Sequence, residues 1–288
     1  MPDKDRLLIL LSMVIWGSVG IFRRSIPIAS ELLAFTRGVI GSLFLILFVK
    51  AKGQKLFQPV AEKDLGLLVL SGAVMGINWL LLFEAYNYTS VSAATLCYYM
   101  QPSILILLSP LFFKEKLTVR KLLCAALALL GMVFVSGVME TGFTDIGELK
   151  GVLLALGAAL IYAFVVILNK KLPGIDAYEK TVIQLLSSGA VMVPYLLLRH
   201  SFHVSGLTPL SLGLVIFVGI VHTGIAYALY FGSVNHVPAQ TVAILSYVDP
   251  LSALLLSALI LGERMSLLSV IGTVLILGSA YMAERQTS

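Results

Sequence analysis

Apolar runs long enough to cross a bilayer recur along the whole chain. A helix needs about 20 apolar residues to span the hydrocarbon core. The predicted spans are 6–23, 31–49, 64–86, 91–113, 118–138, 149–169, 178–198, 209–231, 238–261 and 266–283. Arg37 interrupts the second, and only a tight turn at 235–238 separates the eighth from the ninth, so nine or ten spans are expected. The pattern therefore predicts an all-α integral membrane protein of ten transmembrane helices.

The second half of the chain repeats the first. An offset of 148 residues aligns the halves without a gap from about residue 65 to residue 137 and pairs Asn87 with Asn235, Tyr99 with Tyr247, Pro102 with Pro250 and Glu115 with Glu263. An offset of 146 pairs Trp16 with Tyr162 and Pro27 with Pro173. Matches of this kind exceed the general likeness of apolar helices. We predict two five-helix repeats, 1–140 and 141–288, and because five is odd they have the inverted topology typical of secondary transporters.

Composition and charge restrict the class of protein further. With 59% hydrophobic and 12% charged residues, the chain is not expected to be a soluble domain. The net charge is +5, but the basic residues lie at the ends of apolar runs, so nucleic acid is not an expected partner. Of the 20 Lys and Arg residues, 14 fall in segments that are cytoplasmic if the N terminus is inside. This bias predicts a bacterial-type plasma (inner) membrane and two cytoplasmic termini.

Several segments exclude other classes. The basic start before the apolar residues 7–22 looks like a signal peptide, but further spans follow, and we interpret it as a retained first helix. Cys97 and Cys124 lie within apolar runs, so no disulfide, metal or cofactor is expected. The sequence has no G-x-x-x-x-G-K-[ST] loop for ATP and no H-E-x-x-H or G-x-S-x-G catalytic motif, so an enzyme is not expected.

The chain resembles the drug/metabolite transporter superfamily, EamA type, over essentially its full length. The resemblance is carried by Trp16-Gly17, Arg37 and the two segments that run from Gln101-Pro102 to Lys114-Glu115-Lys116 and from Asp249-Pro250 to Gly262-Glu263-Arg264. It implies ten helices around a central cavity that opens alternately to either side, with amino acids, amines, nucleotide-related metabolites or drugs as substrates. Lys114 departs from the pattern, which would place a glycine there.

Asp249 is the sharpest candidate for chemistry. It lies about eleven residues into the ninth span, near the midplane, and its repeat partner is Gln101. Ionisable groups at membrane depth usually mark a pathway, and a proton-coupling or cation-binding role suits a carboxyl there. The alternative is a purely structural hydrogen bond beside Pro250. His222 is a second proton-coupling candidate, or a neutral imidazole packed between helices.

Aromatic and polar side chains at helical spacing predict a chamber around Asp249. Its expected lining is Trp16, Trp79, Phe83, Tyr98, Gln101, Tyr162, Tyr227, Tyr230, Ser246 and Asp249. On the eighth span, Thr223, Tyr227 and Tyr230 stand at i, i+4 and i+7. Such a chamber could hold a ring by stacking or an ammonium by cation–π attraction, whereas the alternative is ordinary packing between helices.

The remaining candidates are hinges and structural polar residues. Pro102 and Pro250 break backbone bonding beside the polar pair and are the predicted hinges. Arg37 could bind a substrate carboxylate, but a structural pair with Glu31 or Glu84 is favoured. Glu115 and Glu263 are expected to fix loops by pairing with Lys116 and Arg264.

The sequence thus predicts a secondary active transporter, an exporter or exchanger, of an amino acid, amine or drug-like compound. Its partners would be this small-molecule solute, the lipid bilayer and protons, in a monomer or homodimer. The alternatives are an intramembrane enzyme acting on a lipid-linked substrate and a passive channel.

Overall fold

The computed structural model describes residues 2–23, 25–56, 61–89, 91–135, 146–172, 174–202, 206–261 and 266–284. Helices make up all the regular secondary structure in these ranges, with no strand among them. The first half contains α1 (Pro2–Gly17), α2 (Val19–Arg23), α3 (Ser30–Ala51), α4 (Glu62–Ala85), α5 (Val91–Tyr98), α6 (Gln101–Phe113) and α7 (Val119–Val135). The second half contains α9 (Ile146–Lys170), α10 (Ala177–Leu198), α11 (Pro209–Phe217), the π-helix η1 (Val218–Ile225), α12 (Ala226–Ser233), the 3-10 turn η2 (Val234–His236), α13 (Ala239–Leu245), α14 (Val248–Leu261) and α15 (Leu267–Glu284).

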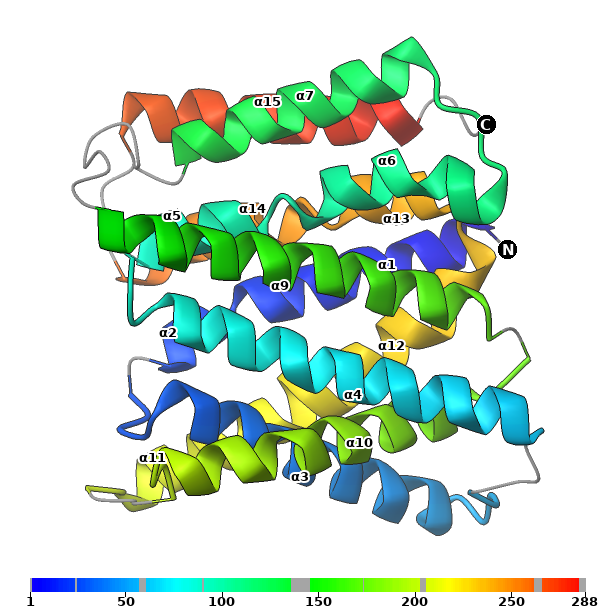
Figure 1. Ribbon diagram of the computed structural model, residues 1–288, viewed down its shortest axis with the longest axis vertical. Helices are drawn as coiled ribbons and strands as arrows, with labels where there is room; N and C mark the ends of the chain where they lie inside the picture. The colour runs from blue at the N-terminus through cyan, green and yellow to red at the C-terminus, as the bar shows by residue number, and fades with distance from the viewer. Residues whose placement is uncertain are drawn as a thin grey trace.

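The helices lie alongside one another in a single bundle (Figure 1). α1 begins and α15 ends at the same end of this bundle, on the right in Figure 1. In the described part of the chain, seven helical segments are long and apolar enough to cross a membrane: Lys4–Arg23, Ser30–Ala51, Glu62–Ala85, Leu149–Lys170, Ala177–Leu198, Pro209–His236 and Ala239–Ile260. The chain is therefore an all-helical, multi-pass membrane protein, while the count of ten spans stays a prediction.

Two spans that were predicted as continuous helices are each broken in the middle. The span 91–113 divides into α5 and α6 around Tyr99, and the span 238–261 divides into α13 and α14 around Tyr247. These two tyrosines are partners in the 148-residue register. Proline lacks an N–H and is tolerated in the first turn of a helix, and Pro102 and Pro250 occupy that turn of α6 and α14. Pro102 and Pro250 therefore lie directly after interruptions of the two predicted helices.

The predicted eighth span also differs from a regular helix. Its middle, η1, is a π-helix between α11 and α12, and bonding from i to i+5 changes which side chains share a face. Thr223 was expected beside Tyr227, but it is fully buried and lies about 3.5 Å from the Val218 carbonyl. α3 crosses η1 closely, because a Cβ on Gly41 would lie 2.9 Å from Gly219 O and from Gly224 N.

Gly17 permits a second close crossing, between α1 and α14. A Cβ at this position would lie 2.5 Å from the Asp249 carbonyl oxygen and 2.7 Å from Ser252 Cβ. No side chain fits at such distances without movement of one helix. Gly17 therefore lets α1 carry the neighbouring Trp16 directly beside the start of α14.

We expect Gly17→Ala to separate α1 from α14 and to lower the free energy of unfolding by about 1–3 kcal/mol, the usual cost of overpacking. Thermal melts of the purified protein measure this change. Gly20→Ala is the matched control, because a Cβ on Gly20 meets nothing within 4 Å. Equal melting temperatures for the two variants would contradict the close crossing.

Glu115 caps the start of α13 and does not form the expected pair with Lys116. Its carboxylate accepts hydrogen bonds from the backbone N–H groups of Ala239, at 2.7 Å, and Gln240, at 3.2 Å. These N–H groups open α13, where no acceptor within the helix is available. Lys170 supports the same turn, since its ammonium donates to the Val234 and Val237 carbonyls.

Glu115→Gln should weaken this cap, because it replaces two charge-assisted hydrogen bonds by a neutral contact. The expected loss is about 1–2 kcal/mol of unfolding free energy, measured as a lower melting temperature. Lys116→Gln is the control and should change the melting temperature little. A larger decrease in melting temperature for Lys116→Gln than for Glu115→Gln would instead support the predicted Glu115–Lys116 ion pair.

The structure also accounts for Lys114. This residue ends α6 with a φ of 56°, in the left-handed region that favours glycine. The glycine that the EamA pattern expects there would adopt this conformation without strain. Glu263 and Arg264, the second predicted pair, lie outside the described residues.

Candidate functional site

A cavity of about 890 Å³ lies in the middle of the bundle between helices of both halves. This volume falls within the range of small-molecule sites. The wall contains nine of the ten predicted lining residues, namely Trp16, Trp79, Phe83, Tyr98, Gln101, Tyr162, Tyr227, Ser246 and Asp249. The tenth, Tyr230, is fully buried and packs on Trp16 with ring centroids 5.2 Å apart. Nine of the predicted residues thus share one cavity, and Tyr230 lies behind it, while their role in binding a substrate stays a prediction.

The cavity extends toward one end of the bundle only. Its wall includes Arg23, which ends α2, Ser30, which begins α3, and Tyr86, which follows α4. These helix ends lie opposite the start of α1 (Figure 1). Toward the start of α1 the wall stops at Met13, because Ile9, one turn further, is fully buried in the core. The described wall residues of α1 thus reach from Met13 toward the end of the bundle opposite the start of the chain.

Hydrogen bonds and ring contacts hold the aromatic wall in place. The Trp16 ring centroid lies 4.8 Å from that of Tyr227, and the Trp16 indole N–H donates to the His222 carbonyl at 2.8 Å. On the facing side, the Tyr98 ring lies 6.1 Å from that of Tyr162. The Tyr98 hydroxyl is 3.4 Å from the Asn78 side-chain oxygen, and the Asn78 amide donates to the Ala158 carbonyl. Asn78 thus positions a wall residue and does not line the cavity itself.

The two helix breaks meet at the polar part of the cavity. Asp249, in the first turn of α14, is the one carboxyl in the described wall, and the Tyr99 hydroxyl lies within its hydrogen-bonding reach. In the reciprocal position, the Tyr247 hydroxyl is hydrogen bonded to Ser103 in the first turn of α6, at 2.5 Å. Each broken helix therefore contacts the start of its counterpart in the other half.

Tyr99 is a wall residue that the sequence analysis missed. In a continuous helix, successive side chains point about 100° apart, so Tyr98 and Tyr99 were not expected to line one cavity. The break between α5 and α6 brings both to the wall. Its pairing with Tyr247 in the repeat register was the signal that could have identified it.

Arg37 lines the cavity instead of pairing with an acid. Its guanidinium carbon lies 5.1 Å from the Trp79 ring centroid. In the described part of the chain it has no ion pair, and its buried Nε has no hydrogen-bond partner. The expected pairing with Glu31 or Glu84 is therefore wrong, and the reason is that both acids have other partners.

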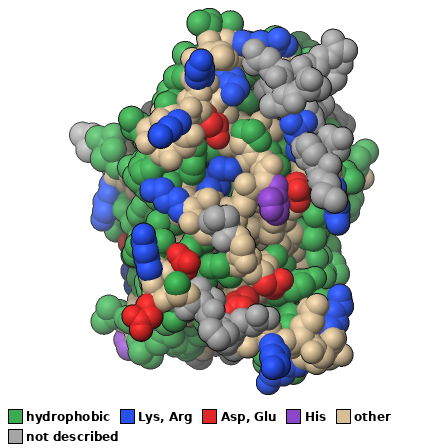
Figure 2. All heavy atoms as spheres, turned by 90° about the vertical axis from the view of Figure 1, so that its right-hand side faces the viewer, with side chains coloured by type: hydrophobic (Ala, Val, Ile, Leu, Met, Phe, Trp, Pro, Cys, Tyr) green, Lys and Arg blue, Asp and Glu red, His purple; other side chains and the backbone are tan. Residues whose placement is uncertain are grey.

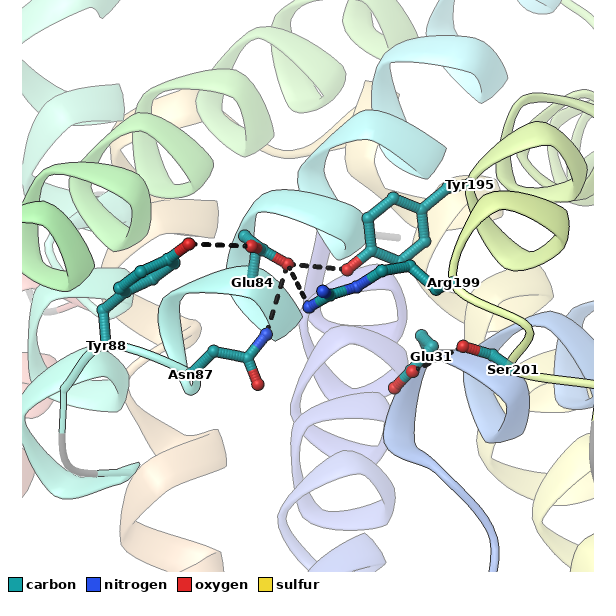
Figure 3. A network of polar contacts seen from close by, with 7 residues as sticks. All are labelled: Glu31, Glu84, Asn87, Tyr88, Tyr195, Arg199 and Ser201. Atoms are coloured by element: carbon teal, nitrogen blue, oxygen red, sulfur yellow. Dashed lines mark hydrogen bonds and ion pairs between the residues drawn. The ribbon is translucent and has the colours of Figure 1, made fainter.

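Glu31, Glu84 and their partners form the polar network drawn in Figure 3. The Glu84 carboxylate accepts hydrogen bonds from Tyr195 at 2.7 Å and from Arg199 at 3.1 Å. Asn87 and Tyr88, which follow α4 in the chain, also donate hydrogen bonds to this carboxylate. Glu31 in turn accepts a bond from Ser201 at 2.9 Å. The network ties the ends of α3 and α4 to the end of α10.

His222 lies behind the cavity wall. Its ring is 2% exposed, is 5.2 Å from the Phe22 ring centroid and contacts the Ser18 hydroxyl through Nε2 at 2.9 Å. His222 contacts the cavity wall through its backbone carbonyl, which accepts a hydrogen bond from the Trp16 indole N–H.

Apolar spanning helices around an aromatic cavity with one carboxyl and one unpaired guanidinium are the features of a membrane transporter. The EamA-like transporter family model matches the chain twice, over residues 6–137 and 149–284. The chain belongs to this family, which confirms the resemblance seen in the sequence.

Relatives carry transporter names. The chain is 31% identical over 271 residues to the uncharacterized transporter YxxF of Bacillus subtilis (strain 168), covering 92% of this chain and 85% of that protein. It is 28% identical over 263 residues to Protein RarD of Salmonella typhi, covering 89% and 86%. A protein of known crystal structure, 22% identical, matches with a TM-score of 0.83 over 97% of this chain and 98% of its own. That likeness supports the fold.

Proposed function

We propose that this protein is a secondary active transporter, an exporter or exchanger of a small organic metabolite, that works by alternating access around the 890 Å³ cavity. The observation that carries the proposal is the aromatic wall around Asp249 at two reciprocal helix breaks. Discontinuous helices near the midplane are typical of transporter binding sites. The cavity size suits an amino acid, an amine or a drug-like compound.

The architecture that we propose is two inverted repeats of five helices, 1–140 and 141–288. The double family match and the equivalent breaks around Tyr99 and Tyr247 support it. The connection between α3 and α4 and the equivalent connection between α10 and α11 lie at opposite ends of the bundle, as inversion requires (Figure 1). Inverted halves can exchange conformations and so open the cavity to the other side.

We place the protein in the bacterial inner membrane with both termini in the cytoplasm. Figure 2 looks onto the end of the bundle where α1 begins, and Lys and Arg side chains are spread across this face among several acidic ones. An excess of basic residues is typical of the cytoplasmic side. In this proposed orientation the cavity wall extends toward the outer side of the membrane.

Asp249 is the proton-coupling residue in this mechanism, and Pro102 and Pro250 provide the hinges at which the half-helices move. Asp249 suits this role because it supplies the one titratable carboxyl of the described wall. A relay through His222, the second candidate, would reach the cavity by way of Ser18, its hydrogen-bond partner.

Transport by reconstituted protein tests the proposal. A thermal-shift screen of amino acids, amines and nucleosides identifies a ligand, because binding to the native state raises the melting temperature. That compound, radiolabelled, is then offered to proteoliposomes preloaded with the unlabelled compound. We expect saturable uptake that the internal compound accelerates. Flux that never saturates, with no acceleration, would indicate a channel and contradict the proposal.

A further inference from the structure

Arg37 is a membrane-embedded cation that forms no ion pair with any described acid. Its side chain forms part of the cavity wall, and the acids that the sequence offered as partners, Glu31 and Glu84, are bound to Ser201 and Arg199. An unpaired charge in a low-dielectric interior is costly. Such a cation persists where a ligand supplies the missing anion.

Arg23 also lies in the cavity wall, but its guanidinium is hydrogen bonded within the protein. Its guanidinium donates to the carbonyls of Ile26 and Ile28 and to the Ser30 hydroxyl. These bonds fix the segment between α2 and α3. Arg37, in contrast, has no hydrogen bond to any described residue, so its donors are available to a ligand.

The surroundings of Arg37 define how a ligand would lie. Trp79 is beneath the guanidinium, and Tyr227 packs against Trp79 with ring centroids 6.1 Å apart. A guanidinium over an aromatic ring still offers its N–H groups in its own plane, in a fork that matches a carboxylate. Asp249 belongs to the wall of the same cavity, so the guanidinium and the carboxyl face one compartment.

We propose that Arg37 binds the carboxylate of the transported solute, and that the solute is an organic acid whose aromatic or aliphatic body packs on Trp79 and Tyr227. This inference rests on the proposed transport function and adds the chemical class of the solute. A solute with a cation as its sole charged group would leave Arg37 unneutralised and add a second positive charge. An ammonium is compatible only in addition to the carboxylate, on the Asp249 side.

Four probes with the same phenyl body separate these possibilities: 3-phenylpropanoate, phenylalanine, 3-phenylpropylamine and 3-phenylpropanol. Binding to the purified full chain is measured by titration calorimetry. We expect the two carboxylates to bind, and the amine and the alcohol to bind at least about tenfold more weakly, because they cannot form a charged bidentate pair. Tighter binding of the amine than of 3-phenylpropanoate would overturn the inference.

Variants of α3 assign the effect to Arg37. Arg37→Gln should weaken 3-phenylpropanoate binding at least about tenfold, and Arg37→Lys, which keeps the charge but loses the fork, should weaken it less. Lys50→Gln removes the same charge from an exposed site on the same helix and should leave binding unchanged. The melting temperature of each unliganded variant shows that it is folded. Undiminished binding by both Arg37 variants would overturn the inference.

Uptake of the same probes into proteoliposomes separates this inference from the proposed function. Arg37-dependent carboxylate binding without uptake would support a carboxylate site at Arg37 and contradict the transport function. Uptake of 3-phenylpropylamine that Arg37→Gln does not change would support the transport function and contradict the carboxylate inference.

Discussion

Asp249→Asn is expected to abolish the pH dependence of uptake into liposomes while leaving the protein folded. Asp249 supplies the one carboxyl in the described wall of the cavity. An amide has nearly the same shape and can still accept a hydrogen bond from Tyr99, but it carries no titratable proton. The variant also makes the second half resemble the first, where Gln101 occupies the equivalent position. Initial uptake rates across a pH series, measured for the wild-type protein and the variant, provide the test.

Two control variants accompany this measurement. Asp249→Glu keeps a carboxyl in the cavity and should retain a pH-dependent rate. Asp176→Asn makes the same acid-to-amide change at the N-cap of α10, where Asp176 accepts the Tyr178 and Glu179 N–H groups and Asn caps nearly as well. Transport by Asp249→Asn that equals the wild-type rate at every pH would remove Asp249 from the mechanism.

Trp79→Ala and Tyr98→Ala are each expected to weaken substrate binding at least about tenfold, which corresponds to about 1.4 kcal/mol. Trp79 is 4% exposed and contacts both Arg37 and Tyr227, so its removal takes away a stacking face and loosens two other wall residues. Tyr98 forms the opposite side with Tyr162. Calorimetric titration of the identified ligand measures both losses.

Ile77 offers the matched control for Trp79. It lies two residues away on α4 and is 41% exposed on the outer surface of the bundle. Ile77→Ala should leave affinity unchanged, and Trp79→Phe should retain part of it because a ring remains. Full affinity in both Trp79→Ala and Tyr98→Ala would refute an aromatic binding chamber.

The sequence predicted the wall of the cavity because two independent patterns agreed. Helical spacing placed Tyr98 with Gln101 and Ser246 with Asp249, and the predicted repeat register aligns the two pairs with each other. All four side chains line the cavity. Local periodicity and an internal repeat are properties of the chain itself, so no knowledge of tertiary packing was needed.

The sequence indicated where the two helices are interrupted, but not the geometry of the breaks or the side chains that contact them. Pro102 and Pro250 marked the positions, since proline interrupts helical bonding. Whether a helix bends or ends at a proline depends on neighbouring helices that supply new partners. Here Tyr247 bonds to Ser103, which is 144 residues away in the sequence.

The partners of the charged residues were the least predictable feature. Proximity in sequence suggested Lys116 for Glu115, but the carboxylate caps α13, more than a hundred residues away. Arg37 has no acidic partner among the described residues, because Glu84 is bound by Tyr195 and Arg199 from α10 and its C-terminal end. Such pairings depend on which helices are neighbours in space, and a single sequence does not reveal that.

The breaks also suggest how the halves communicate. Tyr99 of the first half lies against Asp249 of the second, and Tyr247 of the second is bonded to Ser103 of the first. Both contacts join a half-helix start to the break in the opposite half.

Cysteine labelling tests the proposed inversion of the two halves most directly. In a chain with Cys97→Ala and Cys124→Ala, single cysteines are introduced as Lys52→Cys, after α3, and Leu207→Cys, before α11. Both positions are exposed, and they lie in equivalent connections of the two halves. With a membrane-impermeant maleimide on intact cells, we expect Leu207→Cys to react from outside and Lys52→Cys to react only after permeabilisation. Reaction of both cysteines from the same side would contradict the inverted arrangement.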